Sequence, residues 1–239
     1  MSLSNPQTSQ NPATKIIDWK GSEGYFKYYN KEIKEDIRLE SPLYIIVLDQ
    51  LSTITGYSDE MQSGIWSNEV RLTAKEEFFV KTKQGVQAKG LYQTIKPQIV
   101  QMGGKYAKSV YAVLISGDKE NTKLDLVNFK FYGSSLSPFI EAKIGDTGEV
   151  ILLEQNPEIK KKGATKYYEP KITKLQKRED ILEKAINLDK ELQEYLQAYF
   201  SKEIDGGEII QQSIPQPIAK ASSEMPEINM DEITVQMPF

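Results

Sequence analysis

The sequence contains no cysteine and no histidine. Without cysteine, the chain can form neither disulfides nor thiolate metal sites. Without histidine, it lacks the commonest general base and the commonest ligand for transition metals. These two absences exclude the Ser–His–Asp and Cys–His arrangements of nucleophilic enzymes, and they exclude zinc sites of the usual ligation.

Long apolar runs are also absent. The longest, residues 43–48, is far too short to span a bilayer. The N-terminus, residues 1–14, is polar and lacks the apolar segment of a secretory signal. Of the 239 residues, 39% are apolar and 27% are charged, as in a globular protein with some disordered length. We therefore expect a soluble, cytoplasmic protein.

The chain has no recognisable catalytic or phosphate-binding motif. Gly104-Lys105 would need a glycine at position 99 and Ser or Thr at position 106 to form a phosphate loop, but Ile99 and Tyr106 stand there. The adjacent acids Glu76 and Glu77 would point to opposite faces of a strand. Scattered carboxylates leave a magnesium-dependent nuclease open as an alternative. Our prediction is a protein that is not an enzyme and that uses no metal or cofactor.

Apolar, β-branched and aromatic residues recur in the pattern of strands, and few segments have a helical pattern. We expect strands within residues 24–33, 41–57, 64–72, 75–83, 105–116, 123–133, 148–155 and 160–173. Short helices are predicted at 87–101, which contains Pro97, and at 134–143. The clearest helix is 178–202, because one apolar stripe recurs there at spacings of three and four residues. Its members are Ile181, Ala185, Leu188, Leu192, Tyr195 and Tyr199.

Many short strands without a βαβ rhythm favour a mainly β protein. We predict an oligonucleotide-binding (OB) fold, a five-stranded Greek-key β-barrel with a short helix inserted between its third and fourth strands. The predicted organisation is a disordered N-terminus (1–14), an OB-like domain (15–177), an amphipathic C-terminal helix (178–202) and a disordered acidic tail (203–239). The helical stripe would pack on the barrel or on a second copy of the chain.

The net charge of −4 is unevenly distributed. From Glu203 onward there are seven acids and one base, so the remaining residues hold 29 bases against 27 acids. Within the body, basic and aromatic residues stand next to one another at 19–20, 25–31, 105–111, 130–132 and 160–168. Single-strand binding uses this mixture, because bases stack on aromatic rings and lysines neutralise phosphates without reading sequence.

We therefore predict an interface for single-stranded DNA. The predicted stacking residues are Trp19, Tyr25, Phe26, Tyr28, Trp66, Tyr106, Tyr111, Tyr132, Tyr167 and Tyr168. The predicted phosphate-binding residues are Lys20, Lys27, Lys105, Lys108, Lys130, Lys160, Lys161, Lys162 and Lys166. The competing interpretation is that the rings pack in the core and the lysines are merely solvated.

The last ten residues, MDEITVQMPF, end on an aromatic side chain beside the terminal carboxylate. An acidic tail that ends in Pro-Phe resembles the tips of bacterial and phage single-stranded DNA-binding proteins. The resemblance implies that Asp231, Glu232, Pro238 and Phe239 bind replication, recombination and repair enzymes, with the aromatic ring in an apolar pocket. The chain departs from that pattern at ITVQM, where the family usually continues with acids.

A second resemblance covers roughly residues 20–200. The segments LDQLSTITGYSDEMQSGIWSNEVR and KGLYQTIKPQIVQMGGKYAKSVYA are similar to proteins of tailed phages described as single-stranded DNA-binding proteins. This resemblance implies a role in DNA replication or recombination in the cytoplasm of a phage host. The main alternative is a β-rich structural or assembly protein of a phage that does not bind nucleic acid.

Overall fold

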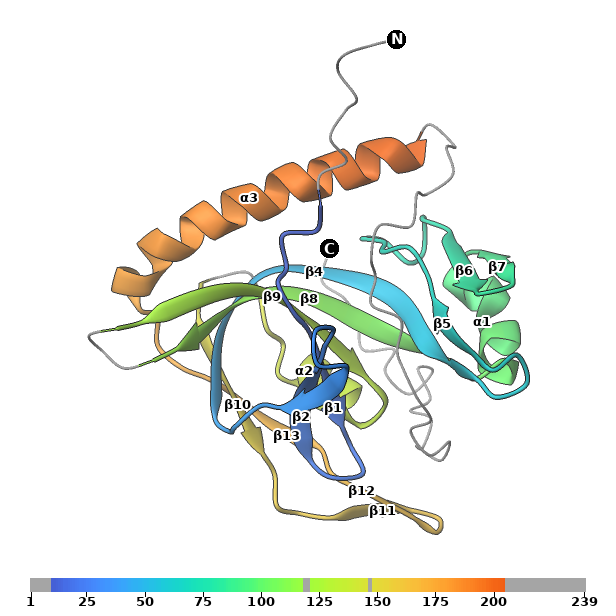
Figure 1. Ribbon diagram of the computed structural model, residues 1–239, viewed down its shortest axis with the longest axis horizontal. Helices are drawn as coiled ribbons and strands as arrows, with labels where there is room; N and C mark the ends of the chain where they lie inside the picture. The colour runs from blue at the N-terminus through green and yellow to red at the C-terminus, as the bar shows by residue number, and fades with distance from the viewer. Residues whose placement is uncertain (1–9, 118–120, 146–147, 205–239) are drawn as a thin grey trace.

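The computed structural model describes residues 10–117, 121–145 and 148–204, and its described part is mainly β (Figure 1). The predicted partner-binding residues Asp231, Glu232, Pro238 and Phe239 lie outside the described residues, as does most of the predicted disordered N-terminus. The strands are β1 (Ile16–Lys20), β2 (Tyr25–Asn30), β3 (Glu35–Arg38), β4 (Leu43–Ser58), β5 (Ser63–Trp66), β6 (Phe78–Thr82), β7 (Gly85–Gly90), β8 (Gly104–Ser116), β9 (Lys123–Tyr132), β10 (Val150–Gln155), β11 (Lys160–Lys162), β12 (Thr165–Tyr167) and β13 (Pro170–Lys174). The helices are α1 (Tyr92–Gln101), the short 3-10 helix η1 (Gly133–Ser135), α2 (Leu136–Glu141) and α3 (Glu179–Ile204).

Eleven strands of the described residues form one mixed sheet. Nine of them follow the order β3-β2-β1-β9-β8-β4-β5-β6-β7, and β10 and β13 are attached at its side. A branch runs from β4 through β10 to β13, and β1 pairs with β9 in parallel. The pairing ends at separate edges, so the sheet does not close into a barrel among the described residues, and the predicted β-barrel is not confirmed. The Greek-key OB topology is likewise not found.

The length of β4 explains why the sheet branches. This strand has 16 residues, and its ladder with β8 shifts register between Val47 and Asp49. Such a bulge bends a strand and increases its twist. One edge of β4 pairs with β10 at its start and with β5 at its end, so the two halves of the strand belong to different parts of the sheet.

The inner face of the sheet, defined here as the face that bears Ile17, Val110 and Phe129, packs into the largest hydrophobic core. Helix α2 covers part of this face, and Phe139 stacks on Phe131 with ring centroids 4.3 Å apart. A second core lies where β4 and β8 meet β5–β7 and α1, around Phe78. Helix α1 starts at Tyr92, later than predicted, because residues 85–90 pair with β6 as strand β7.

The opposite, outer face is crossed by α3 (Figure 1). Near its start, Ile181 and Ala185 pack with Ile46 and Val113, and further along the helix its leucines pack around Tyr111. The predicted apolar stripe is therefore confirmed as a packing face, and its partner is this sheet. The segment before β1 is also attached, since the backbone N–H of Thr14 donates to the Leu126 carbonyl at 2.8 Å.

Candidate nucleic-acid interface

Four of the aromatic residues predicted to stack on bases lie in the hydrophobic cores. Trp19 and Phe26 are 3% and 4% exposed on the inner face, in edge-to-face contact with each other. Tyr106 and Tyr111 are 8% and 1% exposed. Rings that deeply buried cannot stack on a base, so these four assignments were wrong. Trp19, Phe26 and Tyr106 fail because the side chains of successive strand residues point to opposite faces, so a ring directly beside a lysine can point into the core. Tyr111 lies on the outer face, but α3 covers it there.

Two further predicted rings, Tyr28 and Tyr168, are half-buried and pack against the inner core. The Tyr168 ring lies over Gly24, where an added Cβ would come within 2.9 Å of it. The Trp19 indole N–H donates to the Tyr168 carbonyl at 3.0 Å, and the Tyr168 N–H donates to the Gly21 carbonyl at 2.8 Å. Both rings therefore hold elements together, and Tyr168 connects the chain beyond β12 to the β1–β2 turn.

Except for Lys108, the remaining predicted residues of the sheet lie on its outer face, because cross-strand neighbours share a face. Lys20 is the cross-strand neighbour of Tyr25, and Lys27 is the cross-strand neighbour of Asp18. Tyr132 on β9 is the cross-strand neighbour of Ala107 on β8. Thr55 on β4 has Lys105 of β8 as its neighbour on one side and Trp66 of β5 on the other. We call this set the outer strip. Its members are Lys20, Tyr25, Lys27, Tyr132, Lys105 and Trp66, and every one of them is partly exposed.

Two residues that the sequence reasoning missed extend the outer strip. The Arg38 guanidinium lies over the Tyr25 ring, 4.7 Å from its centroid, and Lys81 is the cross-strand neighbour of Trp66. Counting positions in steps of two would have grouped Tyr25 with Lys27 on one face. No sequence signal shows which residue of β3 or β6 lies opposite these rings, because that depends on strand register.

Several predicted phosphate-binding lysines already have acidic partners. Lys27 pairs with Asp36 at 2.7 Å, and Lys20 pairs with Glu23 at 2.5 Å. The hydrogen bond that the Lys20 ammonium group donates to the Glu23 carboxylate raises the pKa of Lys20, so the group stays charged. Exposed pairs of this kind contribute little to stability and can exchange one anion for another. A phosphate could therefore replace these carboxylates at small cost.

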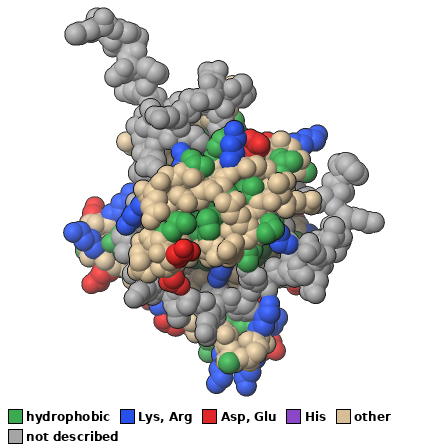
Figure 2. Space-filling view, turned by 90° about the vertical axis from the view of Figure 1, so that its right-hand side faces the viewer, with side chains coloured by type: hydrophobic (Ala, Val, Ile, Leu, Met, Phe, Trp, Pro, Cys, Tyr) green, Lys and Arg blue, Asp and Glu red, His purple; other side chains and the backbone are tan. Residues whose placement is uncertain are grey.

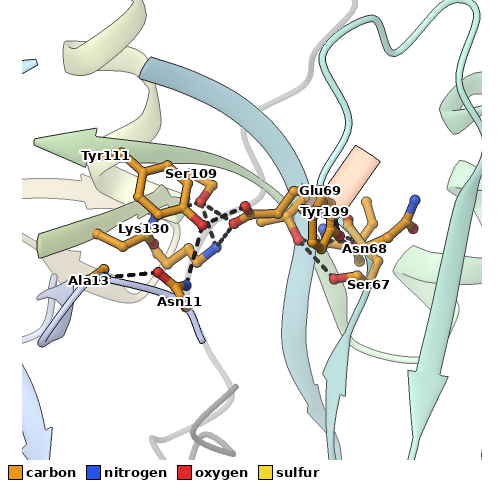
Figure 3. Close-up of polar contacts among 12 residues, drawn as sticks. Asn11, Ala13, Ser67, Asn68, Glu69, Ser109, Tyr111, Lys130 and Tyr199 are labelled. Carbon is orange, nitrogen blue, oxygen red and sulfur yellow. Dashed lines mark hydrogen bonds and ion pairs between the residues drawn. The ribbon is translucent and has the colours of Figure 1, made fainter. Parts of the chain in front are cut away.

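Lys130 is different, because its ammonium group belongs to a buried network of polar contacts that also includes Tyr199 of α3 (Figure 3). Its ammonium group lies 2.6 Å from Glu69 and 2.7 Å from the Ser109 hydroxyl. Ser109 and Tyr111 also donate to the Glu69 carboxylate, and the Glu69 backbone N–H donates to the Tyr199 hydroxyl at 2.8 Å. The prediction that Lys130 binds phosphate is not supported by this geometry.

Two more predicted residues have partners that restrict them. Tyr132 donates to Asp18 at 3.1 Å, and the negative charge of Asp18, together with burial, raises the pKa of the Tyr132 hydroxyl well above its usual value. Lys108 lies on the inner face, opposite to Lys105, and donates to the Ser52 hydroxyl at 3.3 Å. Its location on the core side of the sheet argues against the predicted phosphate contact.

The last four predicted lysines belong to a separate two-stranded hairpin formed by β11 and β12, which extends away from the large sheet (Figure 1). Lys160, Lys161, Lys162 and Lys166 are all exposed, whereas Tyr167 is half-buried. Lys160 pairs with Glu169 at 2.5 Å. Within the described residues, neither Lys161 nor Lys166 forms an ion pair with an acid. The hairpin lies at the bottom of the molecule in Figure 1, and the space-filling view shows Lys and Arg side chains on both sides of the bottom of the molecule (Figure 2).

Comparison with protein-family models, with curated proteins and with solved structures finds no match for this chain. Within residues 10–117, 121–145 and 148–204, no three Asp or Glu side chains are grouped so that they could hold a metal ion. The helices in this part of the chain include none that is long and apolar enough to cross a membrane.

Proposed function

We propose that this protein binds single-stranded DNA without sequence preference and protects it during replication or recombination. The observation that carries the proposal is the outer strip, where strand register gathers partly exposed rings and basic side chains on one face. Flat rings that share a surface with lysines suit unpaired bases, since stacking contributes about 1–3 kcal/mol per base and lysines neutralise phosphates. The proposal does not require a closed OB barrel.

Trp66 is the side chain on which the proposal is most open to test. It is partly exposed and lies between Thr55 and Lys81 across the sheet, so a base stacked on it would place its phosphate near a lysine. The chain has only two tryptophans, and Trp19 is buried. Quenching of tryptophan fluorescence by an oligonucleotide would therefore report on Trp66.

The proposal extends to the acidic C-terminal tip. The resemblance of residues 231–239 to partner-binding tips supports a second role, the recruitment of replication or recombination enzymes by Pro238 and Phe239. Removal of residues 225–239 should abolish capture of such a partner and leave DNA affinity at low salt unchanged or slightly higher. A clear loss of DNA affinity would contradict this separation of roles.

The decisive experiment is a salt titration of binding to oligo-dT and to a duplex of equal length, followed by fluorescence. We expect tighter binding of the single strand, a fall in affinity with rising salt, and quenching that is lost in Trp66→Phe. Trp66→Ala should weaken binding about 5- to 150-fold, the equivalent of about 1–3 kcal/mol. Tyr44→Ala, which removes an exposed ring outside the outer strip, is the matched control and should leave the affinity unchanged.

Two results would overturn the proposal. Absence of binding to either nucleic acid at low salt would favour a structural or assembly protein instead. Equal weakening by Trp66→Ala and Tyr44→Ala would show that the outer strip is not the site.

A further inference from the structure

The hairpin of β11 and β12, here called the finger, has features that a single strand lying on the outer strip does not require. Lys162 pairs with Thr165, so only Gly163 and Ala164 form its turn. Gly163 has φ +60°, as expected for the first central residue of a type II′ turn, which favours glycine. The tip is consequently narrow and carries no large side chain.

The four lysines of the finger are divided between its two faces. Lys161 and Lys166 are cross-strand neighbours and share one face. Lys160 and Lys162 share the other face with Tyr167, because residues two apart in a strand point the same way. Residues 159–168 include four lysines and no acid, although Glu158 and Glu169 adjoin them at the base. Positive charge therefore faces outward on both sides of a thin ribbon.

Charge on two opposite faces suits a ligand that surrounds the finger. A single strand that lies along one face would contact only half of these lysines. The major groove of duplex DNA is about 12 Å wide, admits a two-stranded β-ribbon, and is lined by phosphates along both edges. Lysines on both faces of an inserted ribbon would each be close to one of the two backbones.

The root of the finger adjoins the outer strip. Tyr168 follows β12 directly, and its contacts with Gly21 and Gly24 bind it to the turn between β1 and β2. Lys20 and Tyr25, at the two ends of that turn, belong to the outer strip. A nucleic acid that leaves the finger would therefore meet the outer strip at its Tyr25 end.

We infer that the finger inserts into the groove of a DNA duplex, so that the protein binds a duplex next to a single-stranded segment. This inference rests on the proposed function, because the single-stranded part of the ligand would occupy the outer strip. The finger would contact only the phosphate backbone of the DNA, and such contacts do not distinguish base pairs.

The test compares three probes: oligo-dT, a blunt duplex, and the same duplex with a dT overhang. The variant is Lys161→Gln/Lys166→Gln, which removes two charges from one face of the finger. Its control is Lys184→Gln/Lys190→Gln, which removes two exposed charges from α3. Circular dichroism and thermal unfolding of both variants should match the parent protein, because all four side chains are exposed.

We expect the parent protein to bind the overhang probe more tightly than either other probe. The finger variant should bind it about 10- to 100-fold more weakly near 0.1 M salt, with a salt slope lower by about 2. Its affinity for oligo-dT should change less than about twofold, and the control variant should behave like the parent.

Equal losses on oligo-dT and on the overhang probe would overturn the inference, because the finger would then contact the single strand, while the proposed function would stand. Unchanged affinity for all three probes would also overturn it. If the parent binds the duplex through the finger but does not bind oligo-dT, the proposed function fails and the junction inference fails with it.

Discussion

The buried Glu69 carboxylate offers the sharpest test of what holds the fold together. Glu69 lies in the loop between β5 and β6, is 8% exposed, and accepts hydrogen bonds from Ser109, Tyr111 and Lys130. Burial alone would raise the pKa of this carboxyl, but Lys130 and the two hydroxyls outweigh burial and lower it. The group is therefore ionised at neutral pH, and its charge is balanced by Lys130.

Glu69→Ala should be strongly destabilising. The substitution leaves the Lys130 ammonium group, on a side chain that is 15% exposed, without a counter-charge. Removing one partner of a buried ion pair costs about 3–5 kcal/mol, a large share of the 5–15 kcal/mol typical of a whole domain. The matched control is Glu154→Ala, which breaks the more exposed pair with Lys171 and should cost less than about 1 kcal/mol.

Urea unfolding of the parent and both variants measures the difference, and the pH dependence identifies its origin. Because the pKa of Glu69 is lower in the folded state, its contribution is fully present above the unfolded pKa of about 4.3 and is lost as pH falls through the folded pKa. The gap between parent and Glu69→Gln should therefore narrow in acid. Our reasoning would be refuted if Glu69→Ala cost no more than the control, or if that gap did not depend on pH.

Three further predictions concern the core and the tyrosines. Phe131→Ala should cost about 3–5 kcal/mol in urea unfolding, because the ring is fully buried between Phe129 and Phe139, and a smaller loss would contradict this packing. Tyr199→Phe should cost about 1–3 kcal/mol by the same assay, because the Glu69 N–H loses its acceptor. In alkaline solution, burial raises the pKa of Tyr195 to about 12, so its contribution to stability is full below pH 10 and is lost as pH rises through about 12. Ultraviolet titration should accordingly show tyrosines that ionise late, and ionisation of every tyrosine near pH 10 in the folded protein would refute it.

The sequence predicted local structure better than topology. The apolar stripe of α3 could be read from spacing alone, because the helix buries one face and exposes the other. Closure of a barrel could not be read in this way. It depends on which strands pair, and neither the parallel pairing of β1 with β9 nor the division of β4 between β10 and β5 has a local signal.

In the candidate site, too, local sequence patterns did not predict which way single side chains point. The sequence-based prediction treats an aromatic ring directly beside a lysine as a sign of a binding surface. In a strand that arrangement is also the pattern of any half-buried element, with the ring inside and the lysine outside. Trp19 beside Lys20 and Phe26 beside Lys27 follow this pattern: both lysines lie in the outer strip, and both rings lie in the core.

The informative pattern for a mixed binding surface is therefore a ring two residues from a basic side chain, not one. Tyr25 and Lys27 satisfy this condition on β2, and the structure adds Arg38 from the neighbouring strand. Lys130 and Tyr132 also satisfy it on β9, but both have partners, Glu69 and Asp18, that arrive from elsewhere in the chain. The spacing selects the face of a strand, whereas tertiary contacts decide whether that face remains available. For this reason Trp66, Lys161 and Lys166, for which the described part of the chain shows no such buried partner, are the places where loss of a single ring or charge should be most visible in binding.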